Sequence, residues 1–479
     1  MDIVTLVKGL LNDLFKAEEN FYNDLKDFSK LETTVKESSE KFAAKFLGMV
    51  LDEIDDSIYN DKNWRKGKFN VQRKDKRTLI TTVGDVEFNA TYYKNCKDGG
   101  YSYLIEDVIG LDSHERFSLN AETDLVKIAL DNSYAKAAES LNTSTKITKT
   151  TVMNKVHQIA KEYSKSETVE HKKCEYLYID ADEDHVSEQH GRIKKDSNGF
   201  LSKLIYVYEG KQSSKDSKLK KELINPVYFS GVYEGSKNNA HLWDIVSDYI
   251  FERYDEDYLK TVYINGDGAG WIKSGTNYIP KSKFCLDRFH LFKYIKAASN
   301  QLLDESEIAE KSIYQHLYGH RKKQLIKYLK DIEGIVNNQK PIRDLLSLIQ
   351  NNWDAIMRTI HDTNVMGCSA EGHVSHMLSD RLSSRPRAWS KKGADRISKL
   401  RCYAKNNGRE KIIDLVKYSR EKRMLKRTGT DDIEQVNVNS YKIIRDHYNQ
   451  SKKYIDIYQA SIPGNTVKKI FSIRNNVNI

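Results

Sequence analysis

Residues 175–185 read EYLYIDADEDH and residues 261–269 read TVYINGDGA, and these two stretches decide the fold. In both, a short apolar run rich in β-branched and aromatic residues leads into aspartates, which is typical of a buried strand followed by acidic side chains. Similar apolar runs predict further strands at residues 203–208, 227–232 and 282–286. The sequence therefore predicts a sheet built from these five strands.

The order of the elements predicts how this sheet is connected. Helical periodicity over residues 240–254 separates the third strand from the fourth, and another helix is expected before the fifth. The order β-β-β-α-β-α-β is that of an antiparallel meander followed by crossover connections, so a mixed α/β sheet is expected. The first strand is predicted to end at Ile179 and the fourth at Ile264, just ahead of their acids.

The composition is that of a soluble protein with two to four domains. The chain has 479 residues, of which 39% are hydrophobic and 30% charged. No run approaches the roughly 18 apolar residues of a membrane helix, and no basic region precedes the apolar N-terminal stretch, so neither a membrane span nor a secretory signal is expected. The five cysteines form no CxxC pair, which argues against a disulfide framework or a thiolate zinc site. A reducing, cytoplasmic location is predicted.

A pair of helices ahead of the sheet resembles a DNA-reading unit. A helix at residues 133–141 and a second one beginning near Thr148 predict a helix-turn-helix. Val152 and Val156 of the second helix are expected to face inward. The pattern by itself also fits a helical hairpin that binds nothing. The outward residues predicted to contact DNA are Lys149, Thr150, Asn154 and Lys155.

Positive charge is concentrated in the last quarter of the chain. The whole chain carries a formal charge of +10, yet residues 381–427 alone hold 17 Lys and Arg against four Asp and Glu. Charge concentrated in this way is suited to neutralising phosphates, so contact with DNA is expected here. The arginines predicted to contact DNA are Arg381, Arg385 and Arg387.

The acids that follow the strands predict a cation site. If the first and fourth strands lie side by side, their aspartates come within reach of a hard cation such as Mg²⁺, which prefers carboxylate oxygens and completes its shell with water and phosphate. Gly266 and Gly268 flank Asp267 and leave room for a phosphate backbone. A third carboxylate is expected from Glu371, which opens a later helical pattern. Turns also favour aspartate, so each acid taken alone has a structural explanation.

Two histidine motifs accompany these acids. His373 and His376 lie three residues apart, but without a third soft ligand nearby they are interpreted as surface histidines rather than as a zinc site. Asp287 and His290 follow the fifth strand. They fit three roles that the sequence leaves open: supporting the metal shell, positioning DNA, or capping the next helix.

Four segments resemble bacterial insertion-sequence transposases of the DDE class, ISLre type, a group related to the Mutator-like transposases. They read IDADEDHV (179–186), YINGDGAGWI (263–272), CLDRFHLFKYI (285–295) and CSAEGHVSHMLSDRLSSRPRAWSKKGA (368–394). The resemblance covers nearly the whole chain. It implies an α/β, RNase H-like catalytic core interrupted by an all-helical insertion, and DNA cleavage and strand transfer that depend on two Mg²⁺ or Mn²⁺ ions.

Carried over by position, the resemblance implies that Asp267 and Glu371 are the second and third catalytic carboxylates and bind the metal ions. The first is either Asp180 or Asp182. Asp182 is preferred because the hydrophobic Val186 follows it by four residues, as in related transposases. The two-residue alternation of a strand lets Asp180 share the same face, so the sequence does not separate the two.

The resemblance also implies supporting residues and partners. Asp287 and His290 are similar to an Asp-x-x-His element of the group and are expected to support the site. Element ends and target DNA are the expected partners, and pairing two ends implies a homodimer or higher oligomer at the bacterial nucleoid. An RNase H-like nuclease or resolvase would use the same carboxylates, whereas a DNA-binding regulator derived from a transposase would use none of them.

Seven regions are predicted from these patterns. They are an N-terminal helical region (1–63), a small β-rich region (64–115), the helix-turn-helix domain (116–170), the first part of the core (171–295), the helical insertion (296–365), the last core helix with Glu371 (366–400) and a basic helical C-terminal region (401–479).

Overall fold

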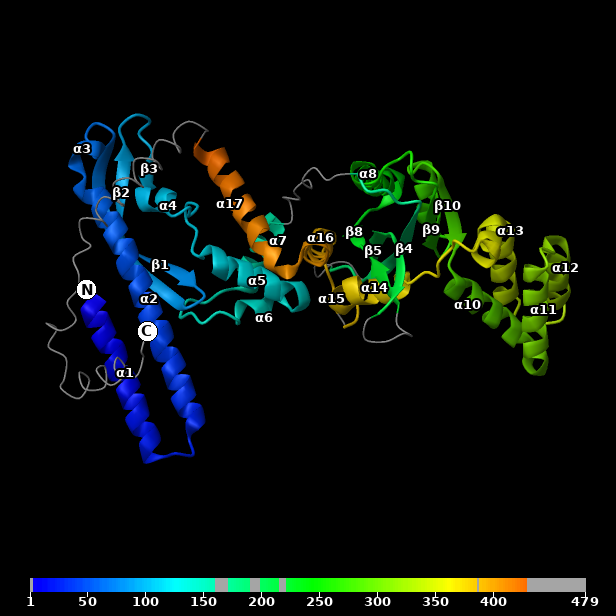
Figure 1. Ribbon diagram of the computed structural model, residues 1–479, viewed down its shortest axis with the longest axis horizontal. Coiled ribbons are helices and arrows are strands. Elements are labelled where there is room, and N and C mark those ends of the chain that lie inside the picture. Colours follow the sequence, from blue (N-terminus) through cyan, green and yellow to red (C-terminus); the bar gives the residue numbers. More distant parts are fainter. Residues whose placement is uncertain (1–2, 160–170, 190–198, 215–220, 386, 429–479) are drawn as a thin grey trace. The chain divides into compact units, whose positions relative to one another are not determined.

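The structure is a computed structural model that describes residues 3–159, 171–189, 199–214, 221–385 and 387–428. The chain divides into two compact units (Figure 1). One contains Met1–Glu162 and Ile412–Ile479, and the other contains Tyr163–Lys411. The last part of the predicted helix-turn-helix region and most of the predicted C-terminal region lie outside the described residues.

The first unit combines a long helical hairpin with a three-stranded antiparallel sheet. Helix α1 (Ile3–Asn23) packs on α2 (Phe28–Asn60), and α2 also packs on the middle strand of the sheet, whose order is β1-β2-β3. Gly48 permits this approach, because a β-carbon there would collide with the carbonyl oxygen of Glu87. The remaining elements are α3 (Lys62–Arg65), β1 (Phe69–Thr81), β2 (Gly84–Asn95), β3 (Tyr101–Tyr103), α4 (Leu104–Val108), α5 (Leu119–Asp131), α6 (Tyr134–Ala138), α7 (Lys149–Ile159) and α17 (Ile412–Thr428), which packs on α5.

The second unit is built on a mixed five-stranded sheet, as the order of elements predicted. Its strand order is β10-β9-β4-β5-β8. The central strand β4 pairs antiparallel with β5 and parallel with β9, while β10 continues the parallel part and β8 the antiparallel part. The strands are β4 (Tyr176–Val186), β5 (Phe200–Tyr208), β8 (Val227–Gly231), β9 (Thr261–Gly266) and β10 (Ser282–Leu286), with a separate ribbon of β6 (Gly210–Ser213) and β7 (Lys221–Ile224).

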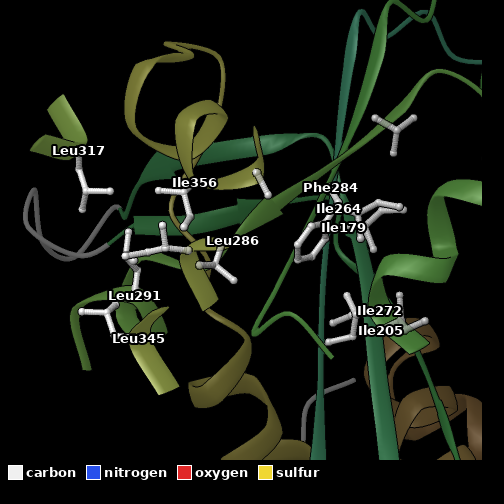
Figure 2. Close-up of a cluster of buried hydrophobic side chains, with 14 of the residues drawn as sticks. Ile179, Ile205, Ile264, Ile272, Phe284, Leu286, Leu291, Leu317, Leu345 and Ile356 are labelled. Carbon is white, nitrogen blue, oxygen red and sulfur yellow. The ribbon is translucent and has the colours of Figure 1, made fainter. Parts of the chain in front are cut away.

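The two faces of this sheet differ in character. Odd-numbered residues of β4, such as Ile179, join a buried hydrophobic cluster with Ile205 of β5, Ile264 of β9 and residues of α8 (Gly235–Arg253) (Figure 2). Successive side chains of a strand point to opposite faces. The even-numbered residues of β4, which include the aspartates, therefore face away from this cluster.

The segment predicted as a helical insertion contains helices joined by short turns, and it shares the core of the sheet. Leu286 of β10 belongs to the same buried cluster as Leu345 and Ile356 of the insertion (Figure 2). The insertion comprises α10 (Arg288–Ser299), a 3-10 turn (Asn300–Glu305), α11 (Ser306–Tyr318), α12 (Lys322–Glu333) and α13 (Lys340–His361). The other elements are α9 (Gly270–Lys273), a 3-10 turn (Ser274–Asn277), α14 (Ala370–Val374), a π-helical turn (Ser375–Ser379), α15 (Asp380–Leu382), α16 (Lys391–Asn407) and a 3-10 turn (Arg409–Lys411).

Two local predictions were wrong. The first sheet strand was expected to end at Ile179, but β4 continues to Val186, because β5 pairs with it along its whole acidic half. The helix expected at residues 133–141 is only α6 (Tyr134–Ala138), and residues 139–148 connect it to α7. This connection is longer than the three or four residues of a helix-turn-helix turn, so that motif is not confirmed.

Among the described residues, no helix is both long and apolar enough to cross a membrane.

Candidate functional site

Asp182 and Asp267 come together at one edge of the five-stranded sheet. Strands β4 and β9 pair in parallel register as far as Asp180, which lies opposite Asn265, and β9 ends at Gly266. Two residues further along each chain are Asp182 and Asp267. At that point β4 still pairs with β5 but no longer has β9 beside it, so Asp182 has no strand partner on that side.

The two carboxylates are partly buried and repel each other. Asp182 Oδ1 accepts the N–H of Glu183 at 2.8 Å, and Asp267 Oδ1 accepts the N–H of Ala269 at 2.8 Å. Burial, and then the charge of Asp267, raises the pKa of Asp182 to about 6. Two partly dehydrated carboxylates held side by side form a donor set that a divalent cation would stabilise.

The raised pKa of Asp182 predicts that the free energy of unfolding of the metal-free protein depends on pH. Because the folded-state pKa of Asp182 is raised above its ordinary value, its contribution to the free energy of unfolding is most favourable below about pH 4 and is lost as the pH rises to about 6. Asp182→Asn should abolish this loss and stabilise the protein at pH 7 by about 1–2 kcal/mol. Urea unfolding of both proteins in EDTA between pH 4 and 7 measures the difference. Parallel stability curves for the two would contradict the prediction.

Asp287 and His290 border the same edge. Leu286 pairs with Gly266, so Asp287 lies beside Asp267. Asp287 caps α10 by accepting the N–H of Phe289 at 3.2 Å, and its Oδ2 lies 2.9 Å from Nδ1 of His290. The hydrogen bond to Asp287 raises the pKa of His290, and the charges of Asp267 and Asp182 add to this. Asp287 therefore both caps α10 and holds the imidazole of His290 near the acidic pair.

Asp180 is fully buried and is saturated with hydrogen bonds. Its Oδ1 accepts from Asn265 Nδ2 at 2.8 Å and from the Tyr208 hydroxyl at 3.2 Å. Its Oδ2 accepts from the Tyr206 hydroxyl at 2.7 Å and from the N–H of Ser369 at 3.0 Å. Burial and the charge of Asp180 raise the pKa of both tyrosines, so the phenols keep their protons and donate them.

The partners of Asp180 link three segments of the predicted site. Asp182 follows Asp180 by two residues, Asp267 follows Asn265 by two, and Glu371 follows Ser369 by two. One buried carboxylate thus ties together the backbone of β4, the side chain at the end of β9 and the segment that begins α14. This supports a structural role for Asp180 and leaves Asp182 as the aspartate that lies beyond the end of β9.

Glu371 lies on the correct side of the sheet but apart from the two aspartates. Helix α14 packs on β4, with His373 stacked at 4.5 Å on the ring of Tyr206. Glu371 itself is exposed. Within the described ranges, no three His, Cys, Asp or Glu side chains are grouped closely enough to hold a metal ion. Asp182 is within electrostatic reach of Asp267 and of His290, which Asp287 holds, whereas no contact of Glu371 with these residues is found in the described part of the chain.

The histidines of α14 and of the turn after it differ. Nδ1 of His373 lies 3.1 Å from the hydroxyl of Tyr228, and burial lowers the pKa of His373. His376 is exposed. His373 is packed against the sheet, which corrects its interpretation as a surface histidine, whereas His376 fits that interpretation.

Three further residues next to the site were missed by the sequence analysis. Glu183 accepts a hydrogen bond from the indole of Trp271, and burial raises its pKa. Lys203 is buried, stacks at 4.6 Å on Trp271, and its charge acts on Glu183. In the sequence, the one hint of this was that a lysine, Lys203, begins the apolar run KLIYVY. Lys203 places a positive charge near Glu183.

The predicted DNA contacts on α7 need one correction. Lys149, Thr150 and Asn154 are exposed, as expected. Lys155 is buried instead of outward-facing, and it forms ion pairs with Glu115 and Glu122. It lies next to Val156 on the packed face of α7, where two carboxylates balance its charge.

Replacing Lys155 is therefore expected to affect folding rather than DNA contact. Lys155→Ala should lower the free energy of unfolding by about 2–3 kcal/mol, because it leaves buried carboxylates without a partner. The loss is limited because Arg420 also pairs with Glu122. Urea unfolding measures it, and Lys149→Ala, at an exposed position on the same helix, is the matched control with no expected change. Equal stability of the two variants would contradict this assignment.

The basic segment 381–427 is less available to DNA than its charge suggested. Arg381 is buried and stacks at 4.5 Å on the ring of Trp389, which corrects its assignment as a DNA contact. Arg385 is exposed and Arg387 is partly exposed. In α17, Arg420 pairs with Glu122 of α5. Part of the positive charge therefore holds the fold together.

The sequence of this chain is similar to those of several bacterial proteins. A protein of Caldanaerobacter subterraneus subsp. tengcongensis is 36% identical over 399 residues, which covers 83% of this chain and 82% of that protein, and its name joins eleven locus designations. Another protein of that organism is 34% identical over 423 residues, covering 86% of this chain and 88% of that protein. A third, with the same identity, has a name that joins four designations.

A solved structure and a family description complete the comparisons. The Drosophila P element transposase strand transfer complex matches 71% of this chain and 94% of that chain at 9% identity and a TM-score of 0.22, which is too low to support an argument. The family described as uncharacterised protein family UPF0236 matches residues 22–419. Because this match spans well over half of the sequence, the chain belongs to the UPF0236 family.

Proposed function

We propose that this protein is a DNA transposase that cleaves the ends of its own element and joins them to target DNA. The observation that carries the proposal is the position of Asp182 and Asp267 two residues beyond the paired Asp180 and Asn265, near the Asp287–His290 pair. Phosphoryl transfer on DNA needs a site that neutralises a negatively charged phosphate and both oxygens of the displacement. Carboxylates that hold cations, with the imidazole of His290 close by, would meet this need.

The residues at the edge fit a divalent cation. Asp182 and Asp267 each keep an Oδ2 oxygen outside the hydrogen bonds found within the described residues. Mg²⁺ binds through one or two protein carboxylates and retains water and phosphate oxygens. Bound Mg²⁺ or Mn²⁺, in two sites, would supply the charge that activates the attacking oxygen and stabilises the leaving 3′-oxygen. His290, held by Asp287, would keep a positive charge next to the phosphate.

Glu371 is proposed as the third carboxylate, brought in when DNA and metal bind. Helix α14 is short and runs directly into a π-helical turn (Ser375–Ser379), a geometry that is frequent at functional sites. The segment before it is tied to β4 through Ser369 and Asp180. A rotation of α14 about this tethered segment would bring Glu371 toward Asp182.

The architecture and the relatives support the proposal independently. Three antiparallel strands followed by two parallel ones, with the first strand in the centre, form the arrangement expected of an RNase H-like core with an all-helical insertion. A relative whose name joins eleven locus designations in one organism fits a gene that copies or moves itself. Lys149, Thr150 and Asn154 of α7, together with Arg385 and Arg387, are the proposed contacts to DNA, and pairing two ends would require at least a dimer.

A cleavage assay on native flanking DNA tests the function. The substrate is a duplex that contains the gene with its natural flanks, incubated with full-length protein and Mg²⁺ or Mn²⁺. Nicks that map to the two element boundaries support transposition, and joining of these ends to a plasmid separates it from a nuclease or resolvase. Tight binding to the flanks without cleavage in either metal would favour a DNA-binding regulator instead.

A further inference from the structure

The three-stranded sheet of the first unit carries an open groove with tyrosines on its floor and cations around it. The groove has a volume of about 530 Å³. It is called here the tyrosine groove, and the residues that define it are Arg73, Arg77, Tyr92, Tyr101, Tyr103 and Arg116. We propose that the tyrosine groove binds a DNA strand with unpaired bases. This inference rests on the proposed function, because it takes DNA as the partner.

The floor of the groove is a continuous aromatic surface. Tyr92 pairs with Tyr103 across β2 and β3, and their ring centroids lie 4.7 Å apart. Tyr101 lies 5.7 Å from Tyr92, with the two rings within 17° of parallel. Tyr101 is 53% exposed. An apolar ring left in solvent next to similarly oriented rings provides a platform on which bases can stack.

Two arginines of β1 hold these rings in place. Arg73 lies 4.4 Å from the ring centroid of Tyr92, and Arg77 lies 4.7 Å from that of Tyr103. Arg73 also pairs with Asp75, which accepts the hydroxyl of Tyr103 at 2.7 Å. These contacts fix the tyrosines in one arrangement before any ligand binds, which lowers the entropy lost on binding.

Other cations remain available for phosphates. Arg116 is exposed, and its guanidinium has no ion-pair partner in the part of the chain that the structure describes. Lys76 pairs with Glu87, but both side chains are mostly in water, where such pairs contribute little. Glu106 is the only carboxylate among the described lining residues, and Arg77 already neutralises it. The groove is therefore positive, as a bound phosphate backbone requires.

The aromatic floor favours unpaired DNA over a duplex. In a duplex the base faces are stacked on one another and cannot reach a tyrosine ring, whereas every unpaired base has a face to offer. Terminal base pairs open more readily than internal ones, so a freshly cut element end would supply such a strand. The tyrosine groove would then hold a cut end.

The test uses the full-length Asp267→Asn protein, so that binding is measured without cleavage. A dye-labelled single-stranded oligonucleotide of about 12 nucleotides is titrated by fluorescence anisotropy, in parallel with the matching duplex. Tyr101→Ala should weaken single-strand binding about tenfold, and Tyr101→Phe should restore it, because stacking needs the ring and not the hydroxyl. Arg116→Ala should also weaken it and reduce the slope of log K against log[salt] by about 0.7.

Matched variants and a direct contact measurement complete the design. Tyr22→Ala and Lys30→Ala alter exposed side chains of the same unit outside the groove and should leave binding unchanged. Photo-crosslinking of an iodouracil-containing strand should label the tryptic peptide of residues 98–116, which contains Tyr101.

Unchanged affinity in Tyr101→Ala and Arg116→Ala, or equal loss in the two control variants, would overturn the proposed groove. So would a preference of this surface for duplex DNA. The proposed transposase would fail separately, through the absence of boundary cleavage by the unmodified protein.

Discussion

Replacing Asp267 by asparagine is expected to lower Mg²⁺-dependent cleavage at the element boundary by at least about 1,000-fold. Asn is nearly the same size and can still accept the N–H of Ala269, so the turn after β9 should persist. What is lost is the negative charge that would hold a cation beside Asp182. Cleavage rates measured at saturating DNA with 5′-labelled flanking duplex give the ratio directly.

The same experiment contains its own controls. Asp182→Asn should cause a similar loss, and the double variant should lose little more, since the two carboxylates act as a unit. Asp244→Asn changes an exposed carboxylate on α8 and should cleave normally. DNA affinity measured without metal should be retained in both site variants. Normal cleavage by Asp267→Asn would move the catalytic site elsewhere in the chain.

The variant Glu371→Ala tests whether Glu371 is the third catalytic carboxylate or lies outside the site. If α14 closes onto the edge of the sheet during the reaction, this exposed residue becomes essential, and cleavage should fall by at least about 100-fold while the free energy of unfolding stays unchanged. The rate and the urea unfolding curve are measured on the same preparation. Full activity of Glu371→Ala would remove this residue from the proposed site.

Asp180→Ala is expected to lower the free energy of unfolding by about 3–5 kcal/mol. The change removes a buried charge that accepts donors from Tyr206, Tyr208, Asn265 and Ser369, and leaves these donors without a partner away from water. Urea unfolding followed by circular dichroism measures the loss.

A nearby aspartate provides the matched control for Asp180. Asp184 lies on the same strand and face and is also buried, but it accepts only the hydroxyls of Ser379 and Ser383, and its Oδ2 has no partner within the described residues. Asp184→Ala should cost only about 1 kcal/mol. A similar cost for both variants would mean that burial alone, and not the link between the three segments, explains the effect of Asp180.

Much of the core was predictable because its signals are local. Apolar runs of strand length and the helical period of residues 240–254 are properties of neighbouring residues, and the structure has the mixed sheet that they predict. The length of β4 was not predictable in this way. Its acidic half is a poor strand by composition and is extended only because β5 pairs with it.

In the candidate site, too, some features follow from local sequence and others depend on long-range pairing. The sequence by itself placed Asp182, Asp267, Asp287 and His290 just after apolar runs, and strands joined in that order bring such residues to one edge of a sheet. The sequence could not decide between Asp180 and Asp182, because the two-residue alternation of side chains along a strand puts both on one face. The tertiary structure distinguishes them, since β9 ends between their levels and Ser369 reaches Asp180 from far along the chain.

The basic residues were the hardest to interpret from sequence. Lys155 and Arg381 carry the same charge as their exposed neighbours, and only their partners in the folded chain, Glu115 and Glu122 in one case and the ring of Trp389 in the other, show that they are buried. Composition determined that this protein has a mild positive excess, a formal charge of +10. Long-range packing alone decided which of these charges stabilise the fold and which remain in solvent, because the free energy of burying a charge depends on partners that are distant in the sequence.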